Sequence, residues 1–231
     1  DWESAKRYAQ MTSQLKDEMV EDAKRLLTHL GIPWVQAPSE GEAQAAYMAS
    51  RGDVWAAASQ DYDSLLFNSP RLVRNLTVSG RRKLPGRSAY VEVEPELIDL
   101  ASVMAELGVS RQQLIDIGIL VGTDFNPNGV KGIGPKTALK LIKEYGSLEG
   151  VSEAKGLTLP ENFRQVREIF LSPRVTAEYR LEWSEPDTDG VIGFLCRERD
   201  FNEDRVKSAL SRIGETLRKA RGKSTLESYF G

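Results

Sequence analysis

Four acidic residues in a short stretch of this chain have the types and spacing that metal-dependent chemistry needs. They form two pairs, Glu40 with Glu42 and Asp61 with Asp63, and each pair directly follows a segment with a strand-like pattern. Open parallel sheets bind ligands beyond the carboxyl ends of their strands, where both pairs are expected to lie. Four carboxylates facing one crevice repel each other unless cations lie between them, and oxygen ligands suit Mg²⁺ or Mn²⁺. The sequence therefore predicts a divalent-metal site.

The elements that must position these carboxylates form a predicted β–α–β unit. Trp34–Ala37 has the pattern of a strand end, and Glu40–Ser50 that of a helix closed by Gly52. Val54–Ser59 follows as a second strand, because it is apolar throughout, as buried parallel strands are. Both acidic pairs then fall at the same edge of the sheet.

Each pair taken alone also has a structural explanation. Ser39 followed by Glu42 is a capping-box pattern, and Asp61 and Asp63 can be turn residues. If the chain stays extended after the second strand, Asp61 and Asp63 point to the same side, because strand side chains alternate. Glu40 and Glu42 converge only if Glu40 precedes the regular helical turns. Together, at one sheet edge, the pairs favour a site.

Composition and charge restrict the class of protein. The chain has 231 residues and 40% hydrophobic content, enough for one large domain or two small ones. The single cysteine, Cys196, excludes an internal disulfide and fits a reducing compartment. No apolar run has transmembrane length and no signal peptide is visible. We therefore expect no membrane partner and an intracellular protein, in the cytoplasm or nucleoid, or in the nucleus of a eukaryote.

The net charge of −3 does not indicate a nucleic-acid binder, but the distribution of charge is more informative. No acidic residue lies between Asp63 and Glu92, a stretch that contains Arg71, Arg74, Arg81, Arg82, Lys83 and Arg87. A second basic run comprises Arg205, Lys207, Arg212, Arg218, Lys219, Arg221 and Lys223. Such runs are as often solvated faces, but basic segments beside an acidic metal crevice suit a polyanionic substrate.

A glycine-rich turn forms the second informative stretch. A predicted helix at Arg111–Val121, capped by Ser110, leads into Asp124 and then the turn GVKGIGP at residues 129–135. Asp124 lies in a loop from which a carboxylate can turn back to the crevice. Backbone amides at such a turn can bind phosphate, and the lysines of the following helix add charge. Two apolar helices joined in this way are typical of modules that grip the DNA backbone without reading sequence.

The remaining patterns predict two strands and several helices. The strands are Arg71–Val78 and Ala89–Glu94, and the helices are Asp1–Leu30, Pro95–Leu107, Pro160–Leu171, Thr188–Arg197 and Asn202–Ala220. The last residues, 221–231, end in apolar Leu226, Tyr229 and Phe230, whose spacing places them on one face of a helical turn. Apolar residues at a polar terminus indicate a docking peptide.

The motifs APSEGEA, SQDYDSLLF, GILVGTDF and GVKGIGPKTALKLI, in this order and spacing, resemble the flap structure-specific endonucleases of the XPG type. The resemblance covers essentially the whole chain. It implies an α/β fold, with a PIN-like parallel-sheet nuclease core, a helix–three-turn–helix DNA-binding module and C-terminal helices. The implied parts are the end of a helical arch (1–30), nuclease core (31–110), DNA-binding module (111–146), C-terminal helical part (147–220) and clamp-binding tail (221–231).

The resemblance also implies the site residues. The family's metal-binding and catalytic carboxylates match Glu40, Glu42, Asp61, Asp63 and Asp124. Its duplex-binding residues match Gly129, Lys131, Gly132, Gly134, Lys136 and Lys140. Two Mg²⁺ or Mn²⁺ ions are implied, together with a K⁺ ion held by backbone carbonyls near Val130 and Ile133.

The implied activity is two-metal hydrolysis of DNA phosphodiester bonds at 5′ flaps and nicked duplexes, with 5′–3′ exonuclease activity, in replication and repair. The closing KSTLESYF resembles the motif that binds the sliding clamp PCNA, through Lys223, Leu226, Tyr229 and Phe230, although Lys223 stands where glutamine is usual.

The family's N-terminal segment, which carries two further aspartates, a lysine and an arginine, has no counterpart in this sequence. We therefore expect this chain to be inactive alone, with that segment as a separate associated chain. The alternatives are a 5′ exonuclease or junction resolvase of the same superfamily, and a non-catalytic, clamp-tethered DNA-binding fragment.

Overall fold

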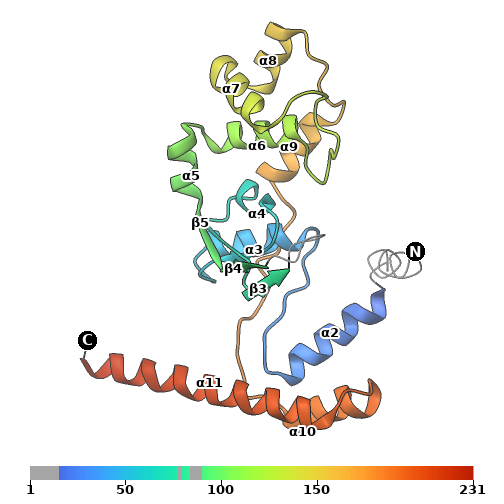
Figure 1. Cartoon of the computed structure of the whole chain (residues 1–231), viewed down its shortest axis with the longest axis vertical. Coiled ribbons are helices and arrows are strands. Elements are labelled where there is room, and N and C mark those ends of the chain that lie inside the picture. Colours follow the sequence, from blue (N-terminus) through green and yellow to red (C-terminus); the bar gives the residue numbers. More distant parts are fainter. Residues whose placement is uncertain (1–15, 78–79, 84–89, 231) are drawn as a thin grey trace. The chain divides into compact units, whose positions relative to one another are not determined.

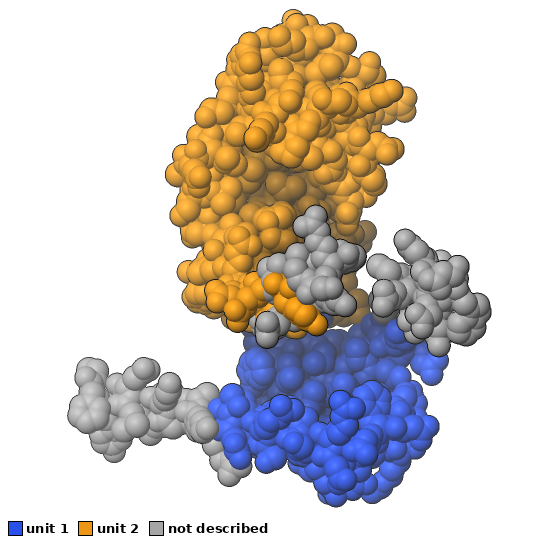
Figure 2. All heavy atoms as spheres, viewed as in Figure 1, with its two compact units in different colours: residues 1–35, 178–231 blue, residues 36–177 orange. Residues whose placement is uncertain are grey.

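The computed structural model describes residues 16–77, 80–83 and 90–230, with side chains for all of these except 81–83, 91 and 218–230. The chain forms two compact units, residues 36–177 and residues 1–35 with 178–231 (Figure 2). Each unit has its own hydrophobic core. No helix in the described part of the chain combines the length and apolar character that crossing a bilayer requires.

A small sheet forms the base of the unit at residues 36–177 (Figure 1). Its strands, in the order β1-β2-β5, are β1 (Ala57–Ala58), β2 (Arg71–Arg74) and β5 (Glu96–Asp99). β1 runs parallel to β2, and β5 joins the other side of β2 antiparallel. Two helices flank β1 in sequence, α3 (Gly41–Ser50) and α4 (Asp63–Leu66). A separate hairpin pairs β3 (Gly80–Lys83) with β4 (Tyr90–Val93).

Five helices complete this unit: α5 (Leu100–Leu107), α6 (Arg111–Val121), α7 (Pro135–Tyr145), α8 (Leu148–Lys155) and α9 (Phe163–Leu171). Their shared core is apolar, and Phe170 at its centre has its ring 4.8 Å from that of Phe67 and 5.4 Å from that of Phe125. Ala46 of α3 and Leu66 of α4 belong to the same core. The elements that carry the acidic residues are therefore packed directly against α6–α9.

One ion cluster, buried at Asp116 and exposed at Glu149, links α6, α8 and α9. Asp116 is fully buried and accepts hydrogen bonds from Arg167 Nε (2.8 Å) and from the backbone N–H of Leu148 (3.2 Å). The guanidinium group of Arg167 also donates two bonds of 2.8 Å to Glu149. Polar contacts thus link α6, α8 and α9 beside their apolar core.

The other unit contains α2 (Asp17–His29), α10 (Thr188–Ile192), the π-helix η1 (Gly193–Glu198) and α11 (Glu203–Phe230). Arginine pairs join α2 to η1. Arg25 donates two bonds of 2.6 Å to Glu198, and Arg199 pairs with Asp22 at 2.8 Å. The apolar contacts of this unit centre on Val191 and Leu210.

Several predicted elements are confirmed. α6 begins after Ser110, which forms a complete capping box with Gln113, and α7 begins with Pro135 directly after the glycine-rich turn. The second half of the predicted helix at Asp1–Leu30 is α2, whereas residues 1–15 lie outside the described residues. The predicted strand at Ala89–Glu94 appears as β4.

Other predicted elements are wrong. Trp34–Ala37 forms no strand, because no described strand lies beside it to accept its hydrogen bonds. The strand predicted at Val54–Ser59 is reduced to Ala57–Ala58, the two residues that have partners on β2. The strand predicted from Arg71 ends at Arg74, because Asn75 turns the chain with a φ of 60°.

The helix predicted from Pro95 begins only at Leu100. Residues 96–99 instead pair with β2, and the Asp99 side chain caps α5 by accepting a bond of 2.8 Å from the N–H of Ser102. Strand pairing here outweighs the helix signal of a proline at the first position. At the other end of the chain, α11 continues past the predicted end at Ala220 to Phe230.

Candidate active site

The first acidic pair lies at the start of α3. Glu40 is the N-cap residue with an extended backbone (φ −68°, ψ 130°), so it precedes the regular turns, as convergence with Glu42 requires. The capping box of Ser39 with Glu42 does not form, because the N-cap is Glu40 and has no side-chain cap bond. Glu42 instead accepts a hydrogen bond from the hydroxyl group of Ser59. The capping explanation for Glu42 is therefore wrong.

The second pair lies between β1 and α4. The chain bends at residues 60–62 instead of staying extended, and Asp63 is the first residue of α4. The Ser59 hydroxyl, which donates to Glu42, also accepts a bond of 3.1 Å from the backbone N–H of Asp61. No sequence motif indicates Ser59, yet its side chain contacts both acidic pairs.

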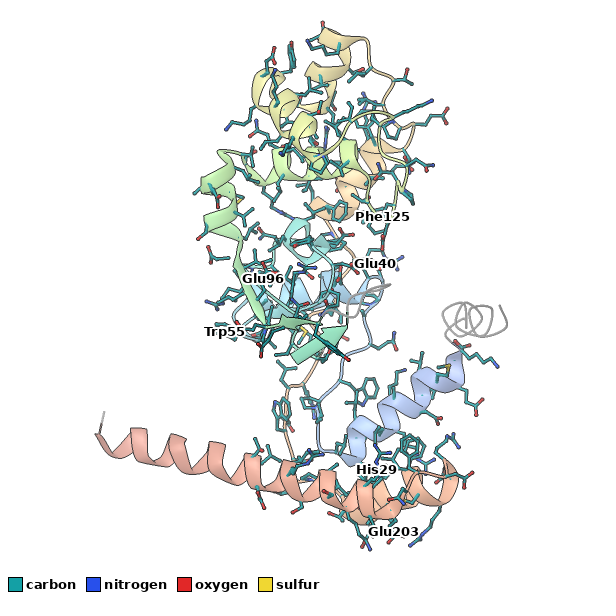
Figure 3. The ribbon with its side chains drawn as sticks, viewed as in Figure 1. His29, Glu40, Trp55, Glu96, Phe125 and Glu203 are labelled. Carbon is teal, nitrogen blue, oxygen red and sulfur yellow. The ribbon has the colours of Figure 1, made fainter. Side chains whose placement is uncertain are left out.

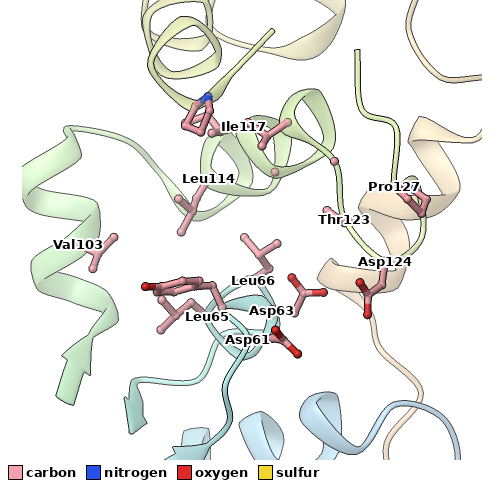
Figure 4. A pocket seen from close by; sticks show the side chains of 15 residues that line it. Asp61, Asp63, Leu65, Leu66, Val103, Leu114, Ile117, Thr123, Asp124 and Pro127 are labelled. Atoms are coloured by element: carbon pink, nitrogen blue, oxygen red, sulfur yellow. The ribbon is translucent and has the colours of Figure 1, made fainter. Parts of the chain in front are cut away.

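Asp61 and Asp63 line a cavity of about 680 Å³ together with Asp124, the acidic residue from the loop after α6. Figure 4 shows these three carboxylates on one side of the cavity, with Leu114 and Ile117 on the other. The structure thus brings together acidic residues from two separate segments, beside an apolar wall. Glu40 instead lines a separate, smaller cavity of about 290 Å³ with Ser39 and Phe67.

The carboxylates influence one another's protonation. Burial, followed by the negative charges of Glu42, Asp124 and Asp61, raises the pKa of Asp63 to about 6. Burial is also the main cause that raises the pKa of Glu42, with smaller contributions from Asp61, Asp124 and Glu40. A raised carboxyl pKa favours the protonated folded state, so this crevice destabilises the fold as the pH rises from 3.8 through about 6. A bound cation would offset that cost.

The donor set suits a hard divalent ion. All five predicted ligands are carboxylates, and oxygen-only ligation is what Mg²⁺ and Mn²⁺ prefer. Within residues 16–77, 80–83 and 90–230, no three His, Cys, Asp or Glu side chains are drawn closely around one point.

A buried polar network holds the loop that carries Asp124. The Thr123 hydroxyl donates to Asn126 Oδ1 (2.6 Å), and Asn126 Nδ2 donates to the carbonyl of Ile119 near the end of α6 (2.8 Å). The N–H of Phe125 donates to the same Thr123 hydroxyl (3.3 Å). Thr123 and Asn126 were not among the predicted site residues, although the Asn126-Pro127 dipeptide is a recognised turn signal.

The glycine-rich turn follows directly. A Cβ on Gly129 would lie 2.5 Å from the carbonyl oxygen of Val121, so this glycine is needed for close packing against α6. Gly132 has a φ of 83° with open space around it, and Gly134 is the N-cap of α7. The lysines predicted to contact DNA, Lys131, Lys136 and Lys140, are all exposed.

The predicted clamp-binding residues lie in the last part of α11. The structure describes only the backbone there, and it is helical at Lys223, Leu226, Tyr229 and Phe230. Their role stays a prediction.

Comparisons with known proteins place this site in a family context. The XPG I-region family matches residues 31–124. Flap endonuclease 1 of Ignicoccus hospitalis is 56% identical over 232 residues, covering 100% of this chain and 66% of that protein. Flap endonuclease 1 of Aeropyrum pernix is 54% identical, covering 99% and 67%. That of Methanopyrus kandleri is 53% identical, covering 99% and 68%. The chain thus spans about two thirds of the length of the curated relatives it matches.

Solved structures of flap endonucleases and related nucleases also resemble this chain. The flap endonuclease-1 from Methanococcus jannaschii superimposes with a TM-score of 0.77 at 45% identity, covering 95% of this chain and 64% of that one. The catalytic core of Rad2 in complex with a DNA substrate gives a TM-score of 0.71 over 92% of this chain and 72% of that one. At 21% identity, the Rad2 match shows a shared fold only.

Proposed function

The chain belongs to the flap endonuclease 1 family, and on that premise we propose that it forms the larger part of a metal-dependent nuclease that cleaves 5′ flaps. The observation that carries the proposal is the continuity of the acidic crevice with the glycine-rich turn. Asp124 lines the cavity, and a few residues later the chain enters the exposed turn before α7. A duplex held at the turn would therefore have its backbone close to the carboxylates.

The chain's own residues would divide the chemistry between them. Glu40, Glu42, Asp61, Asp63 and Asp124 would hold two Mg²⁺ or Mn²⁺ ions. When bound, such ions supply a hydroxide nucleophile at neutral pH and neutralise charge on the attacking and leaving oxygens. The hydroxyl of Ser59 orients Glu42, and the Thr123–Asn126 network orients the loop of Asp124.

The turn would hold the duplex through its backbone. The N–H groups of Gly129, Val130 and Ile133 already bond to backbone carbonyls, so those of Lys131, Gly132 and Gly134 would face phosphate. Lys131, Lys136 and Lys140 would supply charge without reading base sequence. The carbonyls of Val130 and Ile133 would hold a K⁺ ion, which would supply positive charge at the turn. Val130 O already accepts the N–H of Ile133 at 3.0 Å, which leaves its second lone pair available.

The relatives are about half as long again as this chain, and we propose that the N-terminal segment of the family supplies the remaining ligands, joined to this chain or bound as a separate one. The full-length form is defined here as this chain preceded by that segment of a relative, such as the one from Aeropyrum pernix. The proposed substrates are 5′ flaps and nicked duplexes, in replication and repair.

A cleavage assay tests the proposal. The full-length form is incubated with flap, nicked and four-way DNA, with Mg²⁺ or with EDTA. We expect Mg²⁺-dependent cutting at the flap junction, slower cutting at the nick and little at the four-way junction. Preferred cutting of the four-way junction would indicate a resolvase, and binding without cutting would indicate a DNA-binding module.

Replacing Gly132 with valine is expected to weaken duplex binding about tenfold or more and to increase the dissociation constant equally for unrelated sequences. A β-branched residue is strained at a φ of 83°, and the turn must keep its shape to approach phosphate. Filter binding at several salt concentrations measures the effect.

Gly156 provides the matched control for this substitution. It has a φ of 63° and equally open space, but it ends α8 and lies outside the turn. Gly156→Val should cost similar stability and leave duplex affinity unchanged. Equal losses of affinity in both variants would mean that Gly132 acts only through folding.

The double change Tyr229→Ala/Phe230→Ala is expected to abolish binding of this chain to an archaeal sliding clamp in calorimetry. Aromatic anchors at such interfaces cost roughly 2 kcal/mol or more each when truncated. The control is Phe201→Ala, which removes an exposed aromatic residue of the same unit outside the tail and should bind normally. Clamp binding that survives the double change would rule out the tail as the tether.

A further inference from the structure

Tyr62 stands between Asp61 and Asp63, and an arginine of the sheet fixes its position. The guanidinium group of Arg74 lies 4.1 Å from the centroid of the Tyr62 ring, and its Nη1 donates a hydrogen bond to the tyrosine hydroxyl. Arg74 is itself held by a bond from Nε to the carbonyl of Gln60 (3.1 Å) and one from Nη1 to Glu96 (3.2 Å). The ring therefore has a defined orientation.

The Tyr62 side chain is also partly exposed. Tyr62 is 52% exposed, and it lines the same cavity as Asp61, Asp63 and Asp124. A large aromatic side chain held rigidly at this exposure, beside a crevice of carboxylates, contributes little to the core. A cation over one face of an aromatic ring polarises it, and the opposite face remains available for stacking.

We propose that the ring of Tyr62 stacks on the first unpaired nucleobase of the flap, next to the phosphate that is cut. The inference rests on the proposed function. A phosphate at ions held by Asp61 and Asp63 places its own nucleotide beside the residue between them. Within a duplex both faces of a base are covered by its neighbours, whereas an unpaired base at a branch exposes one. Aromatic stacking accepts any base, because every base has a π face.

Trp55 shows that an arginine over an aromatic ring is not by itself enough to make a base-stacking site. Arg71 lies 4.9 Å from the centroid of the Trp55 ring and donates to its backbone carbonyl at 2.8 Å, and Trp55 is 60% exposed. Trp55 does not line the cavity, and Figure 3 shows it well away from Glu40. An arginine over an aromatic ring recurs in the described part of the chain, as at Tyr47 under Arg51, whereas the ring of Tyr62 lines the acidic cavity.

The experiment compares two flap substrates that differ only in an abasic site at the first unpaired position. Dissociation constants are measured with Ca²⁺ in place of Mg²⁺, so that the crevice can hold ions, and single-turnover rates in Mg²⁺, for the full-length form and its variants. Tyr62→Leu should bind and cut the intact flap about tenfold less well, in line with the stacking of one base. On the abasic flap it should differ from the parent less than twofold. Tyr62→Phe should retain the parent's behaviour because it keeps the ring, and Trp55→Leu should match the parent on both substrates.

If Tyr62→Leu lost the same affinity for both substrates, Tyr62 would have a structural role and the inference would be overturned. No loss of affinity for either substrate would also overturn it. The binding constants decide this whether or not the protein cuts DNA. Absence of cutting by the parent protein would contradict the proposed function instead, so that the two failures are distinguishable.

Discussion

Alanine at Asp61 or at Asp124 in the full-length form is expected to slow flap cleavage by roughly a thousandfold or more, on the scale of losing one transition-state-stabilising group. Flap affinity should stay within a few fold of the parent, because these carboxylates line the acidic cavity and are not among the exposed lysines of the turn. Removing negative charge near phosphate should even strengthen binding at low metal concentration. Single-turnover cleavage and filter binding on the same flap measure the two quantities.

Asp53→Ala is the matched control for the loss of an acidic group in the same unit. Asp53 is exposed and pairs with Arg51 at 3.1 Å, outside the cavity. This variant should cleave as the parent does. A loss of binding in proportion to cleavage in Asp61→Ala and Asp124→Ala would contradict the metal assignment.

Replacing Arg167 with methionine should lower the free energy of unfolding by about 3–5 kcal/mol, the usual cost of leaving a buried charge without its partner. Asp116 is fully buried, and Arg167 Nε is 2.8 Å from its carboxylate. Urea denaturation measures the change. The double variant Asp116→Leu/Arg167→Met should recover much of the loss, because an apolar pair needs no charge compensation.

The surface pair of Arg199 with Asp22 provides the contrast, and Arg199→Met should change stability little. If Arg167→Met lowered the free energy of unfolding as little as Arg199→Met, the cluster would not stabilise the packing of α6, α8 and α9.

The same cluster should be sensitive to acid. The hydrogen bonds from Arg167 lower the pKa of Glu149 from 4.5 to about 2. A lowered carboxyl pKa stabilises the fold above pH 4.5, and this contribution is lost as the pH falls toward 2. Burial has the opposite effect on Asp116 and raises its pKa despite the same arginine. The stability of Arg167→Met should therefore decline less steeply than that of the parent between pH 4.5 and 2.

Local signals predicted the parts of the fold that depend on neighbours in sequence. Ser110, which forms a capping box with Gln113, marks the start of α6, and Pro135 after the glycine-rich turn marks the start of α7. Both kinds of signal act over a few residues. The helix predicted at Pro95–Leu107 was wrong at its start because strand pairing with β2 depends on residues about 25 positions away in sequence. The missing strand at Trp34–Ala37 has the same origin, since a strand exists only with a partner.

The candidate site divides in a similar way. Residue types and spacing indicated the acidic pairs at Glu40/Glu42 and Asp61/Asp63, whereas Asp124 alone was an ordinary loop aspartate whose role came from the family resemblance. The hydroxyl of Ser59, the network of Thr123 with Asn126 and the ring of Tyr62 under Arg74 are tertiary contacts. Such contacts join segments by side-chain geometry, which no short sequence pattern encodes.

Anomalous diffraction from crystals of the full-length form grown with Mn²⁺ tests the metal assignment most directly. The proposal predicts anomalous density beside Asp61, Asp63 and Asp124, at the mouth of the cavity, and its loss in crystals of Asp61→Ala. Anomalous density elsewhere in the protein with none at these carboxylates would contradict the central claim that this crevice holds the ions for DNA cleavage.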